Sequence, residues 1–314
     1  MSSRGGALLV VGDVVTDIVA RHRTPPVPGT DTAAAIRTVP GGAGANVACW
    51  AASWGCSDVR LLGRVGADSA TWHEEALTRA GVRSRLIVDS EAPTGTVICL
   101  VDGGVGGGAE RTFLTDSGAS LRLSGADWSS APDLLDGVGW LHLSGYLFFA
   151  EPSREAAEAA LATARARGVP VSVDPASAGF LAELGAERFL AATEGVDVLL
   201  PSEGEARLLA GAPGAGAGRE VGLGVTDAAA GLSRRYPVVV VKQGAAGALV
   251  ARGGEVRAKI PALPATARDS TGAGDAFTGA FLAARLDGAG LYEASAEGCR
   301  AGARAVELVG GRPG

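Results

Sequence analysis

The sequence has few cysteines, and their spacing excludes disulfide-bonded and zinc-bound scaffolds. Four of the 314 residues are cysteine, and no two of them form a C-x-x-C pair: Cys49, Cys56, Cys99 and Cys299. Neither a disulfide framework nor a cysteine-ligated zinc site is expected. We therefore expect buried free thiols in a reducing compartment, and the predicted location is the cytoplasm.

Long apolar runs and an excess of positive charge are also missing. No stretch of eighteen apolar residues occurs, so no segment is predicted to span a bilayer. The start, MSSRGGALLVVGD, enters an apolar strand without the long hydrophobic region and cleavage site of a signal peptide. A net charge of −6 and a pI near 5.2 argue against nucleic acid and anionic membranes as partners.

Two common nucleotide-binding motifs are absent. No G-x-x-x-x-G-K-[ST] occurs, which excludes a Walker-type phosphate loop. The string GAGANV at 42–47 lacks the third glycine of a dinucleotide fingerprint, which argues against an NAD-dependent oxidoreductase. Any nucleotide bound here must be held by other means.

What is present is a regular alternation of strand and helix patterns. With 47% hydrophobic residues the chain has enough apolar material for a large core, either as two domains or as one large domain with an appendage. Buried strands are predicted at 7–11, 59–65, 138–143, 169–173, 196–200, 238–242 and 248–251. Helices are predicted at 69–80, 153–167, 181–192, 202–210, 227–235, 275–286 and 291–308. This order predicts a parallel sheet covered by helices on both faces.

Two stretches depart from the alternation. Residues 21–40 contain four prolines and short β-like pieces without helical periodicity. Strands are predicted at 94–101 and 110–115, around a glycine-rich turn at 103–108. We interpret both stretches as parts of a small β flap, and the loop at 211–218 as a flexible surface connection.

The most informative stretch is RDSTGAGDAFTGAF at 268–281. Its apolar periodicity indicates a helix that begins at or just before Asp275, directly after the small residues Gly272, Ala273 and Gly274. The unpaired N–H groups and the dipole of a helix start bind anions, most often phosphate. Asp275 would then accept a proton from a hydroxyl that attacks a phosphoryl group. The structural alternative is ordinary helix capping and tight packing.

Polar residues near the N-terminal end supply a second candidate site. Asp13 and Asp17 follow the strand at 7–11, and Asn46 lies near the start of a helix that Gly55 ends. Ligands of open α/β sheets bind at the carboxyl ends of strands. The alternative for either aspartate is a turn cap.

The whole chain resembles the PfkB sugar kinases, the ribokinase-like family. DSTGAGDAFTGAF is similar to the C-terminal signature of that family, and GRVGAD (63–68), PSEGEA (201–206) and VVVVKQGAAGA (238–248) fall in the matching order. The resemblance implies a three-layer α/β/α, Rossmann-like domain over 1–314 with a mostly parallel sheet. It further implies a small β-sheet lid formed by segments at about 14–40 and 92–116.

The resemblance also implies ATP-dependent phosphorylation of a hydroxyl on a sugar or sugar-derived molecule, with Mg²⁺. Asp275 matches the catalytic base, and Gly272, Ala273 and Gly274 match the anion hole. Asp17, Gly42 and Asn46 match positions that bind substrate hydroxyls, and Asp13 is a further candidate for that pocket.

The resemblance also assigns four residues to the nucleotide side of the site: Lys242, Gly244, Ser202 and Glu205. Glu205 is expected to help position Mg²⁺ indirectly, while Ser202 replaces the usual asparagine; an exposed helical surface is the alternative for Glu205. Asp269 and Thr271 match a loop that holds a monovalent cation in some members, so a need for K⁺ stays open.

Two other functions compete with a sugar kinase. A nucleoside kinase of the same fold would need an aromatic-lined pocket for the base, and only Phe113 and Tyr146 lie near plausible lid or cleft positions. A non-catalytic sugar-binding protein would have lost the base or the anion hole, and both are present. Exposed lid edges leave a homodimer open, and the identity of the sugar does not follow from the sequence.

Overall fold

The computed structural model describes residues 5–102, 111–211 and 222–313, and its main element is a nine-stranded sheet in the order β13-β12-β11-β10-β9-β8-β1-β4-β5. The strands are β1 (Ala7–Val11), β4 (Val59–Gly66), β5 (Val82–Asp89), β8 (Val138–Ser144), β9 (Val171–Asp174), β10 (Val198–Leu199), β11 (Val238–Lys242), β12 (Ala248–Arg252) and β13 (Glu255–Ile260). Neighbouring strands pair in parallel except β12, which is antiparallel to β11 and β13. The predicted turn at 103–108 and residues 212–218 of the predicted loop lie outside the described residues.

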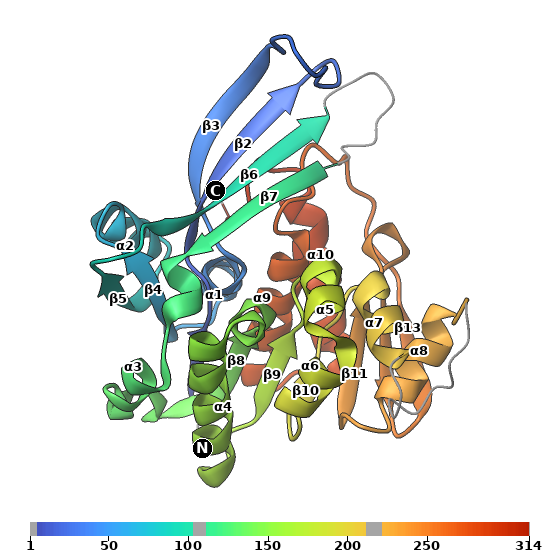
Figure 1. The fold of residues 1–314 in the computed structure, drawn as a ribbon. Helices are drawn as coiled ribbons and strands as arrows, with labels where there is room; N and C mark the ends of the chain where they lie inside the picture. Colours follow the sequence, from blue (N-terminus) through green and yellow to red (C-terminus); the bar gives the residue numbers. More distant parts are fainter. Residues whose placement is uncertain (1–4, 103–110, 212–221, 314) are drawn as a thin grey trace.

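Helices cover both faces of this sheet (Figure 1). Leu8 and Val10 of β1 pack in one core, and Leu9 and Val11 pack in another, because successive side chains of a strand point to opposite faces. The first face carries α1 (Ala43–Ser53), α2 (Ala70–Arg79), α9 (Ala273–Leu286) and α10 (Leu291–Ala305). The second carries α3 (Gly125–Ser129), α4 (Glu151–Ala166), α5 (Ala178–Leu184), α6 (Ala186–Ala192), α7 (Glu203–Ala210) and α8 (Val225–Leu232). The predicted three-layer α/β/α fold is confirmed.

A second, four-stranded sheet projects from one end of the large one (Figure 1). It consists of β2 (Val15–His22), β3 (Ala34–Gly41), β6 (Thr94–Asp102) and β7 (Arg111–Gly118), in the order β3-β2-β6-β7. The two stretches predicted as a flap therefore join in one sheet, through parallel pairing of β2 with β6. We call this sheet the lid.

Two strands were not predicted, and two predicted helices end or break earlier in the structure. The unpredicted strands are the edge strands β5 and β13: β13 alternates charged with apolar residues, and β5 has only a three-residue apolar run, Leu86 to Val88. The helix predicted at 181–192 is split into α5 and α6 at Gly185, whose φ is 90°. The helix predicted at 291–308 ends at Ala305.

The connections of β1 create a crevice in the sheet. β1 lies between β4 and β8. The strands β4 and β5, which follow first in the sequence, lie on one side of β1, and the later strands β8 to β13 lie on the other. The order therefore reverses between β1 and β8, where open α/β sheets bind their ligands.

None of the helices in the described parts of the chain is both long and apolar enough to cross a membrane.

Candidate active site

A cavity of about 710 Å³ lies between the lid and the carboxyl ends of the parallel strands. Lid side chains such as Val15 and Phe113 border it on one side, and Asp174 and Lys242, at the ends of β9 and β11, border it on the other. It collects most of the predicted site residues: Asp13, Asp17, Gly42, Asn46, Ser202, Glu205, Lys242, Gly244, Thr271, Gly272, Gly274 and Asp275. Ala273 and Asp269 do not line it.

The start of α9 has the geometry of an anion site. Gly272 precedes the helix in the left-handed region, with φ 71°, and a Cβ there would lie 2.5 Å from the Cα of Gly311. The first helical bond runs from the Ala276 amide to the Gly272 carbonyl at 2.8 Å. The amides of Gly274 and Asp275 precede it and are available at the helix start. The Ala273 amide instead donates to the Ser270 carbonyl at 3.3 Å, which differs from its predicted place in the anion hole.

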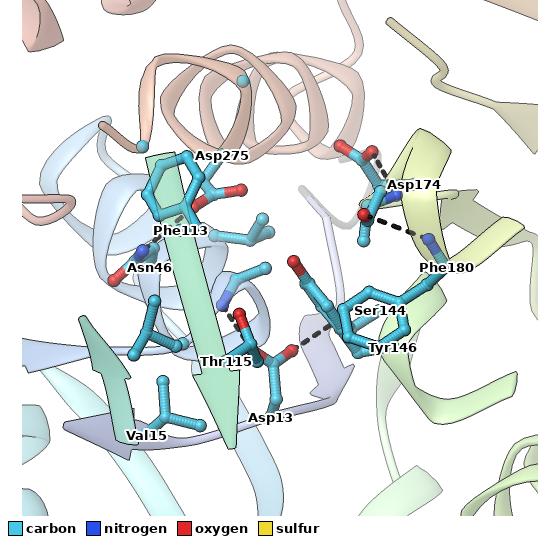
Figure 2. A pocket seen from close by; sticks show the side chains of 18 of the residues that line it. Asp13, Val15, Asn46, Phe113, Thr115, Ser144, Tyr146, Asp174, Phe180 and Asp275 are labelled. Atoms are coloured by element: carbon cyan, nitrogen blue, oxygen red, sulfur yellow. Dashed lines mark hydrogen bonds between the residues drawn. The ribbon is translucent and has the colours of Figure 1, made fainter. Parts of the chain in front are cut away.

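Asp275 faces the cavity from the first turn of α9 (Figure 2). Its Oδ2 accepts a hydrogen bond of 2.9 Å from Nδ2 of Asn46. Burial raises the pKa of Asp275 to about 7; the Asn46 bond and the Lys242 charge oppose this rise, and the Asp174 charge adds to it. The carboxyl group is therefore poised to take up a proton near neutral pH.

The C-terminal tail orients the amide of Asn46. Nε of Arg312 donates to Oδ1 of Asn46 at 3.3 Å, and Nη2 donates to the Gly41 carbonyl at 2.9 Å. Nε1 of Trp50 donates to the Gly311 carbonyl at 2.9 Å, which fixes the tail against α1. Because Oδ1 accepts from Arg312, Nδ2 points toward Asp275. Arg312 was not predicted as a site residue, since the tail carries no recognisable motif.

The two N-terminal aspartates differ in their surroundings. Asp13 accepts from the amides of Ala43 and Gly44, at 2.6 and 3.1 Å, and from Oγ of Ser144 at 2.7 Å (Figure 2). Its oxygens thus accept from the first amides of α1 and from Ser144 of β8, while the residue also lines the cavity. Asp17 lies on β2 of the lid, and burial raises its pKa to about 7.

Glycines give both aspartates room. A Cβ at Gly41 would lie 2.2 Å from the Asp17 carboxyl carbon. Gly42 has φ 98°, and a Cβ there would lie 2.5 Å from the Asp13 carbonyl. The double glycine before α1 therefore allows the backbone to approach both acidic residues.

A buried ion pair places a positive charge beside the start of α9. Nζ of Lys242 pairs with Oδ2 of Asp174, which also accepts from Oγ1 of Thr278 at 2.9 Å. A Cβ at Gly274 would lie 3.4 Å from the Lys242 Nζ. Burial disfavours the ammonium, but the charges of Asp174 and Glu205 outweigh it and raise the pKa of Lys242. Asp174 was missed as a site residue, although its place before Pro175 at a strand end was a usable signal.

Ser202 and Glu205 form a capping box at the start of α7. Oε2 of Glu205 accepts from the Ser202 amide at 2.7 Å, and Oγ of Ser202 accepts from the Glu205 amide at 3.4 Å. Glu205 is buried, so its assignment to an exposed helical surface is wrong. Burial raises the pKa of Glu205, and the Asp174 charge adds to this. Gly244 opens a short 3₁₀ turn after β11 with φ 55°.

Three aromatic residues line the cavity: Phe113, Tyr146 and Phe180. Tyr146 packs edge-to-face on Phe180, with 5.8 Å between the ring centroids, and Phe180 stacks on Phe149 at 5.2 Å. Phe113 extends from β7 of the lid and is 50% exposed (Figure 2). Phe113 and Tyr146 were predicted near the lid or cleft, and Phe180 was not.

Comparisons with known proteins agree with this geometry. The family model for pfkB family carbohydrate kinases matches residues 7–314. A fructokinase of Klebsiella pneumoniae is 31% identical over 88% of this chain and 84% of its own length.

Two solved structures share the fold. An adenosine kinase from Sinorhizobium meliloti superposes with a TM-score of 0.83 at 21% identity, covering 99% of this chain and 96% of its own. A putative ribokinase II from E. coli, in complex with ATP and Mg²⁺, has a TM-score of 0.79 at 24% identity, covering 98% and 94%. The chain therefore belongs to the pfkB family of carbohydrate kinases and is a phosphotransferase with a hydroxyl group as acceptor.

Proposed function

We propose that Asp275 is the general base for transfer of the γ-phosphoryl group of ATP to a hydroxyl of a sugar. The observation that carries this assignment is the carboxyl group with a pKa of about 7 at a helix start inside the cavity. The acceptor oxygen bonds to phosphorus, the bond from phosphorus to the departing ADP oxygen breaks, and the hydroxyl proton goes to Asp275. Because Oδ2 accepts from Asn46, we assign Oδ1 to that proton.

Charge that develops on the transferred group would be stabilised from the side of α9. The amides of Gly274 and Asp275 and the ammonium of Lys242 lie at this helix start. Donors fixed in advance need no reorganisation during the reaction. The lid would close the cavity against water and limit hydrolysis of ATP.

Mg²⁺ fits the donor chemistry of the nucleotide side. Among the described residues no group of three or more acidic, histidine or cysteine side chains converges on one point. Mg²⁺ commonly relies on one or two carboxylates together with substrate phosphates and water. We therefore assign Glu205, which lines the cavity, to the ion or to its water shell. When bound, Mg²⁺ neutralises charge on the phosphates.

The charge of the cavity indicates a neutral acceptor. One cation, Lys242, lines its described part, against six acidic side chains: Asp13, Asp17, Asp174, Glu183, Glu205 and Asp275. A sugar phosphate or sugar acid would be repelled, because no guanidinium or ammonium lines the acceptor end among the described residues; the nearby Arg312 guanidinium is held by Asn46 and Gly41. Asp17 and Asn46 are suited to the hydroxyls of an uncharged sugar.

Replacing the base tests the proposal. We expect Asp275→Asn to lower kcat with the preferred sugar by about 10²–10⁴-fold, with sugar binding by calorimetry retained. Asp287→Asn, at the other end of α9, is the matched control and should keep full activity. Undiminished turnover in Asp275→Asn would refute the assignment.

A nucleoside acceptor is the second candidate, favoured by the aromatic border of the cavity. Tyr146, Phe180 and Phe113 could stack on a base. Turnover of fructose and of adenosine by the same preparation distinguishes the two functions. Phe113→Ala should reduce kcat/KM for a nucleoside much more than for a free sugar.

The lid also supports the homodimer proposal. Ile36 on β3 and Leu114 on β7 are 64% and 55% exposed. Light scattering of the protein and of Ile36→Asp tests whether the lids of two copies pair.

A further inference from the structure

Arg111, at the start of β7, reaches from the lid to the loop before α9. Its Nη1 donates to Oγ1 of Thr271 at 3.0 Å, and its Nη2 donates to Oγ of Ser270. Nη1 also lies 3.8 Å from Oδ1 of Asp269. The Asp269 side chain is 1% exposed, so its negative charge meets the guanidinium largely out of water. A positive charge thus lies against residues 269–271, which immediately precede Gly272 in the sequence.

The oxygens of this loop already accept hydrogen bonds from the chain. Oδ1 of Asp269 accepts from the amide and the hydroxyl of Thr271, at 2.9 and 2.6 Å. Oδ2 accepts from the Gly310 amide at 3.0 Å. The nearby Val306 carbonyl accepts from the amides of residues 268 and 269, at 2.7 and 3.1 Å.

Such a loop does not fit K⁺. A potassium site replaces the hydration shell of the ion with a ring of oxygens directed at one point. Here the lone pairs of Asp269 are directed at N–H and O–H groups, and the guanidinium holds the hydroxyls of Ser270 and Thr271. The donor set therefore satisfies an arginine, not a metal ion.

The electrostatics of Asp269 agree with this reading. Burial by itself would raise its pKa, but the bonds from Thr271 and Gly310 and the Arg111 charge lower it. The carboxylate is thus ionised, and its partner is the guanidinium, which stays protonated at any working pH.

We propose that Arg111 is the built-in cation of the 269–271 loop, so that the anion-binding turn is ordered without a monovalent metal ion. Arg111 is a positioning residue: it holds Thr271, which leads into Gly272, and it does not touch the reacting atoms. Because it belongs to β7, it also joins the lid to the turn.

The first test compares the wild-type protein in the chloride salts of K⁺, Na⁺ and choline. Each salt is used at an ionic strength of about 0.1 M, so that the screening of charges is the same in all three. We expect the melting temperature to agree among the salts and kcat to agree within about twofold, a difference of about 0.4 kcal/mol. Tenfold activation, or marked stabilisation, by K⁺ over choline would overturn the proposal.

The second test removes the guanidinium. In choline chloride, Arg111→Met should have a kcat at least about tenfold lower than the wild type and a lower melting temperature. KCl should restore part of the kcat and part of the melting temperature. Arg111→Lys retains the charge and should stay insensitive to K⁺. Arg85→Met, which breaks an exposed ion pair with Asp133, is the control and should match the wild type.

Melting temperature keeps this test independent of the proposed reaction, since it needs no turnover. An Arg111→Met variant as active and as stable as the wild type in choline chloride would refute the inference, while leaving Asp275 as the base. Inactivity of the wild type on every sugar and nucleoside would refute the proposed function, while leaving the salt response of its melting temperature to decide on Arg111.

Discussion

Removal of the Asn46 amide should shift the pH dependence of the reaction in a defined direction. The amide donates to Oδ2 of Asp275 and so favours the ionised base. In Asn46→Ala that support is lost, while the burial that raises the pKa of Asp275 to about 7 remains. The pKa should therefore rise further, and the base should be protonated over a wider range of pH.

The magnitude follows from the strength of the bond. A hydrogen bond to a charged group contributes about 1.5–3 kcal/mol, and 1.36 kcal/mol corresponds to one pKa unit. The lower end of that range raises the pKa by about 1. At pH 7 the ionised fraction then falls from about one half to about one tenth, and kcat/KM falls about fivefold for this reason alone.

A profile of kcat/KM from pH 5.5 to about 9.5 measures the effect, because it reports the ionisation of the free enzyme. Any loss of sugar contact by Asn46 lowers the profile equally at all pH values, whereas the pKa effect moves its acid limb to higher pH. Trp54→Phe removes another hydrogen bond of α1, the 3.0 Å bond to Glu297, and should leave the acid limb in place. An Asn46→Ala profile that falls uniformly, with its midpoint unchanged, would refute the reasoning.

Other substitutions probe the same site. Gly272→Ala should cost at least about 3 kcal/mol of unfolding free energy, and Gly288→Ala about 1–2 kcal/mol. Both glycines have a positive φ, but only at Gly272 would the added Cβ collide with backbone atoms. Urea titrations of the two variants measure the difference. Lys242→Met should cost about 3–5 kcal/mol of unfolding free energy, because it leaves the buried Asp174 carboxylate without its cation. Burial raises the pKa of Asp17 from 3.8 to about 7, which destabilises the wild type above pH 4. Asp17→Asn should therefore have a higher melting temperature than the wild type at pH 8 and the same melting temperature near pH 3. Equal melting temperatures at pH 8 would contradict this.

Local patterns predicted the parallel core because each of its central strands is a short apolar run. The edge strands β5 and β13 were not predicted, because β13 alternates charged and apolar residues and the apolar part of β5 is only three residues long. The helix predicted at 181–192 was split because Gly185 lies between its two halves with a positive φ. Strand pairing within the lid depends on segments far apart in sequence, so only the existence of its pieces was predictable.

The site was predictable where its residues follow a motif. Asp275, Gly272 and Lys242 belong to recognisable strings, and the cavity brings them together. No motif assigned a contact to Arg111 or Arg312, because their partners lie more than 150 residues away along the chain: Arg111 contacts Thr271 across 160 residues and Arg312 contacts Asn46 across 266. Such contacts become visible only when the fold is known.

The turn before α9, which we propose binds the transferred phosphoryl group, is held from outside by the last residues of the chain. The Gly310 amide bonds to Asp269, the Gly311 carbonyl accepts from Trp50, and the Gly311 backbone packs where a side chain at Gly272 would stand. A turn of small residues is flexible by itself, because glycine restricts φ and ψ least. These contacts limit the conformations of the turn before a phosphate binds. The turn would then need little reorganisation during the reaction. Small residues at this turn thus serve two purposes: they admit the ligand on one side and the tail on the other.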